Sequence, residues 1–289
     1  MTAGSGATGA GEGRPVPFYK LTGSGNDFVF FDERGGAAGA LARFREPAAI
    51  EALCDRRNGV GADGVVFVES AGDGEVRIAY YNRDGSRAAL CGNATLCTAR
   101  LAAVLGFASG PDEPFVVSTD AGRIAARVPA TGDPRIELGP VRDVAPEAAA
   151  VAREPGERAV GYALAGVPHL VVLVDDVERV DLDRRGAELR APNAARPDGA
   201  NVNWVSRAGD RWRMRTFERG VEGETLACGT GAVACATLIA RWTGSDGPIT
   251  LVTSSGRPVD VVPGADGAHA VLAGEGRIVF SGELAGVNV

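Results

Sequence analysis

The chain has 289 residues, a net charge of −7 and a hydrophobic fraction of 45%, values typical of a soluble protein with one large domain or two of ordinary size. It contains no basic cluster with interleaved aromatic residues, which argues against a nucleic-acid partner. No apolar run is long enough to cross a membrane, and residues 1–15 lack the apolar core of a secretory signal. We therefore expect a disordered tail over 1–15 and a cytoplasmic location.

The first half of the chain is predicted to consist mainly of strands, because apolar and polar residues alternate between turn residues. The expected strands are 18–21, 27–32, 64–69, 76–82, 115–118 and 122–128. Apolar residues at helical spacing predict one helix over 47–55 and another that starts after Cys91 and stops at Gly106. The segment 130–134, which contains glycine and proline, is expected to be a linker.

The second half repeats this scheme. Its expected strands are 135–138, 158–164, 170–174, 202–207, 211–218, 249–253, 259–262, 268–272 and 277–281, with helices over 180–190 and 232–242. Each half thus contains strands, a helix after a Cys-Gly pair, and further strands, which indicates an internal duplication.

These patterns predict an α/β (α+β) fold with two pseudo-symmetric domains, each a mostly antiparallel or mixed sheet wrapped around a central helix. The expected N-terminal domain comprises residues 16–134 plus 275–289, and the expected C-terminal domain comprises residues 135–274.

The five cysteines do not suggest disulfides or a metal site. Their number is odd, no export signal precedes them, and no two form a Cys-x-x-Cys pair. His169 and His269 lie at no metal-ligand spacing from them, so no metal is expected. Lys20 is the sole lysine and stands in no recognisable cofactor motif. Because pyridoxal phosphate requires a lysine for its Schiff base, we expect catalysis without that cofactor.

The most informative feature is a repeated helix start. Cys91-Gly92-Asn93 and Cys228-Gly229-Thr230 each place a cysteine and a glycine before a helical segment. The free N–H groups and the dipole at a helix start favour an ionised thiol and can hold a substrate carboxylate. We expect two thiols that face one carbon, one removing its proton and the other supplying a proton. Either cysteine alone would more often be a packing residue, the role expected for Cys97 and Cys235 two turns later.

Three further polar features accompany the thiols. Glu218 and Arg219 come one loop before the second cysteine and could clamp the ammonium and carboxylate of an amino acid, although solvated charge pairs are commoner. Asn26, in a glycine-rich turn, could contribute a polar contact. His169 precedes a strand, where a lone histidine is more often structural but could tune a nearby thiol.

Taken together, the motifs resemble those of the diaminopimelate epimerase family over residues 18–284. The matching segments are Lys20-Leu21-x-Gly23-x-Gly25-Asn26-Asp27-Phe28, Gly59-x-Gly61-Ala62-Asp63-Gly64, Asn82-x-Asp84-Gly85-Ser86, Cys91-Gly92-Asn93, Pro168-His169, Asn201-Val202, Glu218-Arg219-Gly220 and Glu224-Thr225-x-Ala227-Cys228-Gly229-Thr230-Gly231. The combination is highly specific, whereas no single motif would be.

The resemblance implies a cofactor-independent isomerase with its active site between two domains. It implies interconversion of LL-2,6-diaminopimelate and meso-diaminopimelate, a step of lysine and peptidoglycan-precursor biosynthesis, by a possible homodimer. Cys91 and Cys228 match the acid/base thiols, which His169 and Glu218 are thought to tune. The implied substrate contacts are Asn26, Asn82, Asn201, Glu218 and Arg219, with Gly92, Asn93, Gly229 and Thr230 around the reacting carboxylate.

Three residues depart from the family pattern. Val167 replaces a frequent asparagine, Gly64 replaces an amide found in some relatives, and Leu96 replaces a usual arginine. An epimerase or racemase of another amino acid is therefore the first alternative. A thiol-redox protein that cycles through a disulfide and a non-catalytic amino-acid-binding module are the alternatives from other classes.

Overall fold

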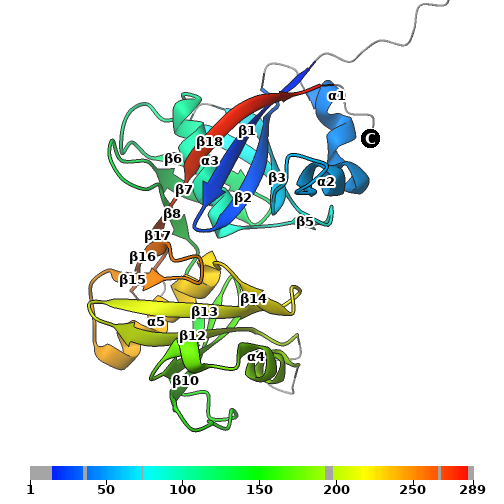
Figure 1. The fold of residues 1–289 in the computed structure, drawn as a ribbon. Coiled ribbons are helices and arrows are strands. Elements are labelled where there is room, and N and C mark those ends of the chain that lie inside the picture. Colours follow the sequence, from blue (N-terminus) through cyan, green and yellow to red (C-terminus); the bar gives the residue numbers. More distant parts are fainter. Residues whose placement is uncertain (1–14, 35–37, 73, 193–197, 266–267, 286–289) are drawn as a thin grey trace, which may run out of the picture.

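The computed structural model describes residues 15–34, 38–72, 74–192, 198–265 and 268–285, so the expected tail lies almost wholly outside the described residues. Within these ranges the strands form one continuous hydrogen-bonded sheet of eighteen strands with few helices (Figure 1). In the same ranges, no helix has the length and apolar character needed to span a bilayer.

The N-terminal half has a mixed sheet and a central helix. Its strands are β1 (Val16–Gly23), β2 (Asn26–Asp32), β3 (Gly64–Gly72), β4 (Glu75–Asn82), β5 (Arg87–Ala88), β6 (Phe115–Thr119), β7 (Gly122–Arg127) and β8 (Arg135–Leu138). Its helices are α1 (Ala38–Leu41), η1 (Ala42–Arg45), α2 (Pro47–Cys54) and α3 (Gly92–Val104). The pairing order is β1-β2-β3-β4-β6-β7, parallel at β2–β3 and β4–β6 and antiparallel elsewhere.

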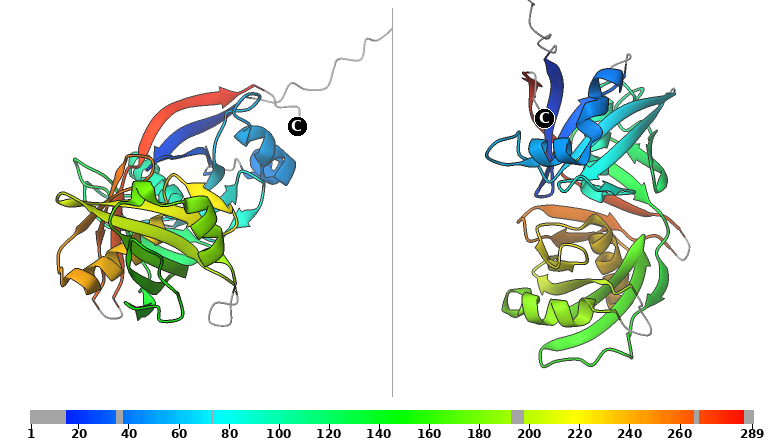
Figure 2. Two further views of the ribbon diagram at one scale, coloured as in Figure 1. Left: turned by 60° about the horizontal axis from the view of Figure 1, so that its bottom comes forward. Right: turned by 90° about the vertical axis from the view of Figure 1, so that its right-hand side faces the viewer.

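The C-terminal half repeats this arrangement. Its strands are β9 (Arg142–Ala145), β10 (Glu157–Ala165), β11 (Val167–Val174), β12 (Asn201–Ala208), β13 (Arg211–Glu218), β14 (Gly223–Thr225), β15 (Ile249–Val252), β16 (Pro258–Val262), β17 (Ala270–Gly274) and β18 (Arg277–Leu284); its helices are η2 (Val177–Arg179), α4 (Leu182–Arg190) and α5 (Gly229–Thr243). The order β10-β11-β12-β13-β15-β16 has the same strand directions as its counterpart. The two halves are therefore pseudo-symmetric and form two lobes (Figure 2).

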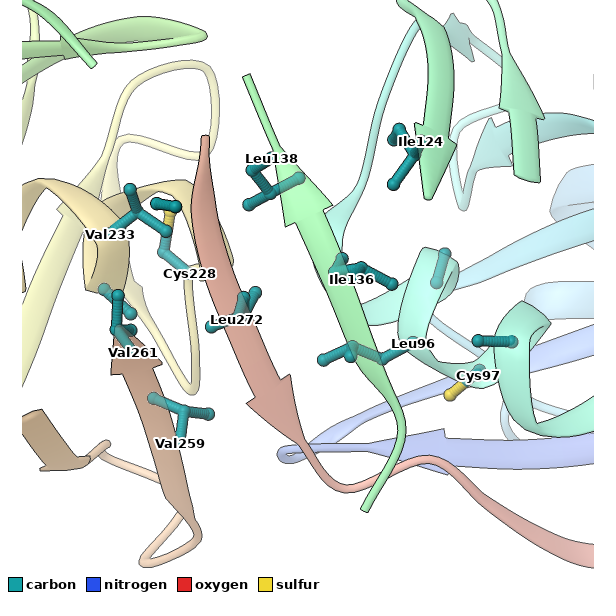
Figure 3. Packing of buried hydrophobic residues seen from close by; sticks show 14 of the residues in the cluster. Leu96, Cys97, Ile124, Ile136, Leu138, Cys228, Val233, Val259, Val261 and Leu272 are labelled. Carbon is teal, nitrogen blue, oxygen red and sulfur yellow. The ribbon is translucent and has the colours of Figure 1, made fainter. Parts of the chain in front are cut away.

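The chain passes twice between the lobes. Strands β8 and β17 pair antiparallel between them, with Ile136 opposite Leu272 (Figure 3). After β8 the chain adds β9 to the edge strand β10 of the C-terminal half, and after β17 it adds β18 to β1 of the N-terminal half. The sheet of each lobe thus gains an edge strand from a segment that has just crossed over from the other lobe.

The sheets curl around α3 and α5 because these helices carry mostly small residues and are buried along most of their length. Leu96 and Cys97 of α3 and Val233 of α5 belong to one apolar cluster, which continues through β8 and β17 (Figure 3). At the far end of α5, Gly244 adopts a φ of 70° and donates its N–H to Ala240 at 2.8 Å, the left-handed C-cap that favours glycine. Both helices are therefore fixed at the centre of their lobes.

The predicted α/β class with two pseudo-symmetric sheet-and-helix units is confirmed. Every predicted strand and helix is present, and α5 begins at Gly229, three residues earlier than expected. Strands β5, β9 and β14 were not predicted, because two to four polar or small residues carry too little alternation to be detected. The expected domain boundaries, 16–134 plus 275–289 and 135–274, stay a prediction, and residues 286–289 lie outside the described residues.

Candidate active site

The starts of α3 and α5 meet at the centre of the molecule. A Cβ atom built on Gly92 would lie 3.4 Å from Gly229 Cα, and a Cβ atom on Gly229 would lie equally close to Gly92 Cα. Cys91 and Cys228 are the N-cap residues of the two helices. Glycine after each cysteine lets the two backbones approach, so both cysteines stand at the contact between the two helix starts.

Cys228 is 8% exposed, and its Sγ accepts the N–H of Gly231 at 3.4 Å, with Thr230 Oγ1 at 3.5 Å. Burial raises the pKa of this thiol to about 12, and the Glu218 carboxylate adds to the rise. The Cys91 thiol also has a raised pKa, again chiefly from burial, while the N–H groups at the start of α3 oppose that rise.

The N–H groups at each helix start lower the pKa of the thiol, as expected, but both thiols still have a net raised pKa. The lowering effect of the helix N-terminus is present but smaller than the desolvation of a buried thiolate.

A hydrogen-bonded chain leads from the core of the C-terminal half to Cys228. Thr216 Oγ1 donates to Asn203 Oδ1 at 3.0 Å, and Asn203 Nδ2 lies 3.1 Å from His169 Nδ1. His169 Nε2 lies 3.1 Å from Thr230 Oγ1, which is the hydroxyl beside the sulfur. The Asn203 Nδ2 group also donates to the carbonyl of Leu170 at 3.1 Å, which orients the amide.

This chain fixes the proton on His169. Because the Asn203 amide donates to Nδ1, the remaining proton of a neutral imidazole must lie on Nε2 and point to Thr230. His169 is fully buried, and burial together with the positive charge of Arg219 lowers its pKa to about 3. His169 is therefore a neutral hydrogen-bond donor and not a cation that stabilises a thiolate.

The start of α3 is held by a different network. Asn93 Nδ2 donates to Asn26 Oδ1 at 2.7 Å, and Asn26 Nδ2 donates to Asp63 Oδ2 at 3.0 Å. Since a carboxylate only accepts, Asp63 determines which way the Asn26 amide points. Asn93 and Thr230 occupy equivalent positions in the two helices but have different partners.

Charged groups support this network from behind. Lys20 Nζ lies 2.7 Å from Asp27 Oδ2 and donates to the carbonyl of Gly61, and Arg56 bridges Asp27 and Asp63 at 2.6 and 2.8 Å. The buried lysine therefore has a structural partner.

The remaining predicted residues lie at the strand ends around the helix starts. Glu218, at the end of β13, is largely buried, and burial raises its pKa; its charge acts on both thiols. Asn201 is buried and accepts the backbone N–H of Arg219 at 2.8 Å, while Arg219 Nη1 donates to Asp198. Asn82 ends β4 and donates to Ser86 Oγ at 3.0 Å.

Sequence reasoning missed Asn203, Thr216 and the orienting role of Asp63. The signal for Asn203 was a second polar residue between apolar neighbours, at alternate spacing from Asn201. Within the described ranges, no cluster of three or more histidine, cysteine or acidic residues is arranged to hold a metal ion.

Comparison with known proteins decides the family. The family model described as diaminopimelate epimerase matches residues 18–144 and 161–279. The chain belongs to the diaminopimelate epimerase family. A diaminopimelate epimerase from Gemmatimonas aurantiaca is 48% identical over 94% of this chain and 100% of its own length, and one from Aquifex aeolicus is 35% identical over 93% and 98%. The chain is thus an isomerase by family, as its sequence motifs predicted.

Solved structures at low identity share the epimerase fold. A phenazine biosynthesis protein of the PhzF family from Bacillus anthracis has a TM-score of 0.68 at 14% identity, with coverage of 94% of this chain and 99% of that one. A hydroxyproline epimerase from Agrobacterium vitis, solved with trans-4-hydroxy-L-proline, has a TM-score of 0.62 at 16% identity over 94% and 91%. These similarities show a shared fold and do not identify the substrate of this chain.

Proposed function

We propose that the protein interconverts LL-2,6-diaminopimelate and meso-diaminopimelate, with Cys91 and Cys228 as acid and base. The contact between the starts of α3 and α5, each capped by one of these cysteines, is the observation that carries this proposal. The curated relatives of the family bear the name of the same enzyme.

In the proposed reaction, one thiolate removes the α-proton from one face of the substrate carbon. The opposite thiol then donates its own proton to the other face, so that the configuration inverts and the thiolate now lies on the second cysteine. The two roles exchange in the reverse direction. No proton or electron is gained overall, so the chemistry needs no cofactor.

Because the pKa values of both thiols are raised, we propose that the bound substrate helps one thiol to ionise. An α-ammonium group beside Glu218 would bring positive charge toward two buried thiols and would favour ionisation of one of them. Glu218, whose own pKa is raised by burial, would become a better partner for that ammonium once it is ionised. We therefore expect the reactive thiolate to form mainly in the substrate complex.

The substrate carboxylate fits the two helix starts. The free N–H groups at Gly92, Asn93, Gly229 and Thr230 would hold it and would stabilise the negative charge that develops when the α-proton leaves. His169 acts through Thr230, whose hydroxyl it fixes beside Cys228. His169 is thus a positioning residue in this proposal.

The far end of the substrate is assigned to polar residues at the rim of the site. Asn26, Asn82, Asn201 and Arg219 would recognise the second amino-acid group of diaminopimelate. Val167 occupies the position in β11 equivalent to Asn26 in β2, so one polar contact is absent on that side. This substitution is the observation that keeps epimerisation of another amino acid as the second candidate.

The finer expectations are a homodimer, a cytoplasmic location and a role in lysine and peptidoglycan-precursor biosynthesis. The five cysteines are free, which suits an active site that needs two reduced thiols. Each of these expectations stays a prediction.

The test is an NMR assay in deuterium oxide with diaminopimelate isomers and a panel of common amino acids. We expect loss of the α-proton signal and formation of the second isomer with diaminopimelate, and neither with the other amino acids. Turnover of another amino acid alone would favour the second candidate. Absence of exchange with every compound would favour the binding module or the thiol-redox protein.

Variants of the thiols test the mechanism. Cys91→Ala and Cys228→Ala should each lower epimerisation by about three orders of magnitude, because either direction needs both an acid and a base. The matched controls are Cys97→Ala and Cys235→Ala, which alter buried cysteines deeper in the same helices. Near-normal turnover by either of the first two variants would refute the two-thiol mechanism.

A further inference from the structure

Tyr80 is a buried tyrosine next to the Cys91 thiol. It lies in β4, is 8% exposed, and packs edge-to-face against Phe28 with the ring centroids 6.0 Å apart. Tyr80 and Cys91 line one small pocket together with Leu90 and Thr95. The phenol and the thiol also perturb each other's pKa. The phenol of Tyr80 thus lies beside Cys91 on the side of the sheet.

The pseudo-symmetry of the fold gives this contact a counterpart. Phe28 pairs with Gly64 as His169 pairs with Asn201, so the two pairs occupy equivalent places in the two halves. Two residues further along the strand, Val66 faces Tyr80 in one half and Asn203 faces Thr216 in the other. Tyr80 is therefore the structural equivalent of Thr216, which begins the chain to Cys228.

The N-terminal half has no such polar chain at these positions, because Phe28 and Val66 stand where the other half has His169 and Asn203. Asn93, the equivalent of Thr230, is turned to Asn26. The long phenol of Tyr80 extends from β4 toward Cys91 without intervening residues, where the other half uses Thr216, Asn203 and His169 in turn. A hydroxyl group thus lies beside each cysteine, from Thr230 in one half and from Tyr80 in the other.

Gly64 makes room for the phenol. A Cβ atom on Gly64 would lie 2.7 Å from Tyr80 Cε2 and 3.1 Å from the hydroxyl oxygen. The equivalent residue of the other half, Asn201, carries a full side chain. A larger residue at position 64 would therefore displace the phenol from its place beside Cys91.

We propose that Tyr80 is a positioning residue for Cys91, whose hydroxyl donates a hydrogen bond to Sγ as the thiolate forms and holds the sulfur toward the substrate carbon. This inference rests on the proposed function, in which Cys91 is one of the two acid/base thiols. Burial raises the pKa of Tyr80, so the phenol keeps its proton and remains a donor. The same hydrogen bond lowers the pKa of Cys91 against the larger rise from burial.

The test is the Tyr80→Phe variant, which removes only the hydroxyl. The rate of alkylation by iodoacetamide is measured from pH 7 to 10, and mass spectrometry of tryptic peptides quantifies Cys91 and Cys228 separately in the same sample. Loss of a hydrogen bond to a charged sulfur should slow the alkylation of Cys91 about tenfold at each pH, the equivalent of a rise of about one unit in its pKa. The profile of Cys228 should not change.

Tyr81→Phe is the matched control. Tyr81 is the next residue of β4, is equally buried, and packs on the opposite face of the sheet against Phe67 with the ring centroids 5.7 Å apart. Its loss of a hydroxyl should leave both thiol profiles unchanged.

An unchanged or faster alkylation of Cys91 in Tyr80→Phe would overturn the proposal, and so would an equal change at both thiols, which would indicate a general packing effect. Alkylation requires no substrate. A failure of this inference is therefore distinguishable from a failure of the epimerase proposal, which the exchange assay tests independently.

Discussion

Replacement of His169 by glutamine should remove a pH dependence from the stability of the protein. His169 is fully buried, and its pKa falls from an ordinary value near 6.5 to about 3 in the folded state. The unfolded chain therefore takes up a proton at a pH where the folded protein does not. This contribution to stability is fully present above pH 6.5 and is lost as the pH falls toward 3.

The size of the effect follows from the two pKa values. Each pH unit between them removes about 1.4 kcal/mol of unfolding free energy, and the whole interval removes roughly 5 kcal/mol. The interval from pH 6.5 to 4.5 should therefore remove about 2.7 kcal/mol. Solvent screening should not reduce this free-energy change, because His169 is 0% exposed.

The assay is equilibrium urea unfolding of both proteins between pH 7.5 and 4.5. All three tryptophans, Trp204, Trp212 and Trp242, lie in the C-terminal half with His169, so their fluorescence reports on the relevant part of the molecule. The contributions of titrating carboxylates are the same in both proteins, so they cancel in the difference between the two unfolding free energies. The difference in unfolding free energy should narrow by about 2.7 kcal/mol as the pH falls to 4.5. A constant difference would mean that His169 titrates normally and that its assignment as a neutral donor is wrong.

Two further changes test the packing by the same urea assay. Arg185→Ala should cost about 3–5 kcal/mol, because Arg185 and Glu157 are 4% and 6% exposed and the carboxylate would remain buried without its partner; Arg184→Ala, at 56% exposure, should cost less than about 1 kcal/mol. Gly64→Ala should cost about 1–3 kcal/mol, since its methyl group would meet a backbone carbonyl at 2.6 Å. Gly247→Ala, where no neighbouring residue lies within 4 Å of the added methyl group, should leave the free energy of unfolding unchanged. Equal losses of unfolding free energy in Arg185→Ala and Arg184→Ala, or in Gly64→Ala and Gly247→Ala, would contradict the packing described.

The duplicated architecture could be predicted from sequence because it leaves a repeated local signal. Cys91-Gly92 and Cys228-Gly229 each precede a helical pattern, and the alternation on either side predicts the strands. The family motifs around these residues led to the isomerase class. The contact between Gly92 and Gly229 could not be derived from local pattern, because it depends on how two segments more than a hundred residues apart pack together.

The partners of the thiols could not be predicted for a related reason. Tyr80 follows Val76 and Ile78 at alternate spacing, so its pattern is that of an ordinary core residue. Asn203 lies in a strand whose neighbours are apolar, and its role depends on a histidine that is contributed by another strand. The raised thiol pKa values likewise arise from tertiary burial, which outweighs the local effect of a helix start.

The strand β18 has a consequence for the order in which the protein forms during synthesis. Strand β1, among the first described residues, pairs on one side with β2 and on the other with β18 near the end of the chain. The ribosome must therefore release residues 277–284 before β1 can acquire this second neighbour. The C-terminal sheet, from β9 to β17, is encoded without interruption and can close while that earlier edge still waits for its partner.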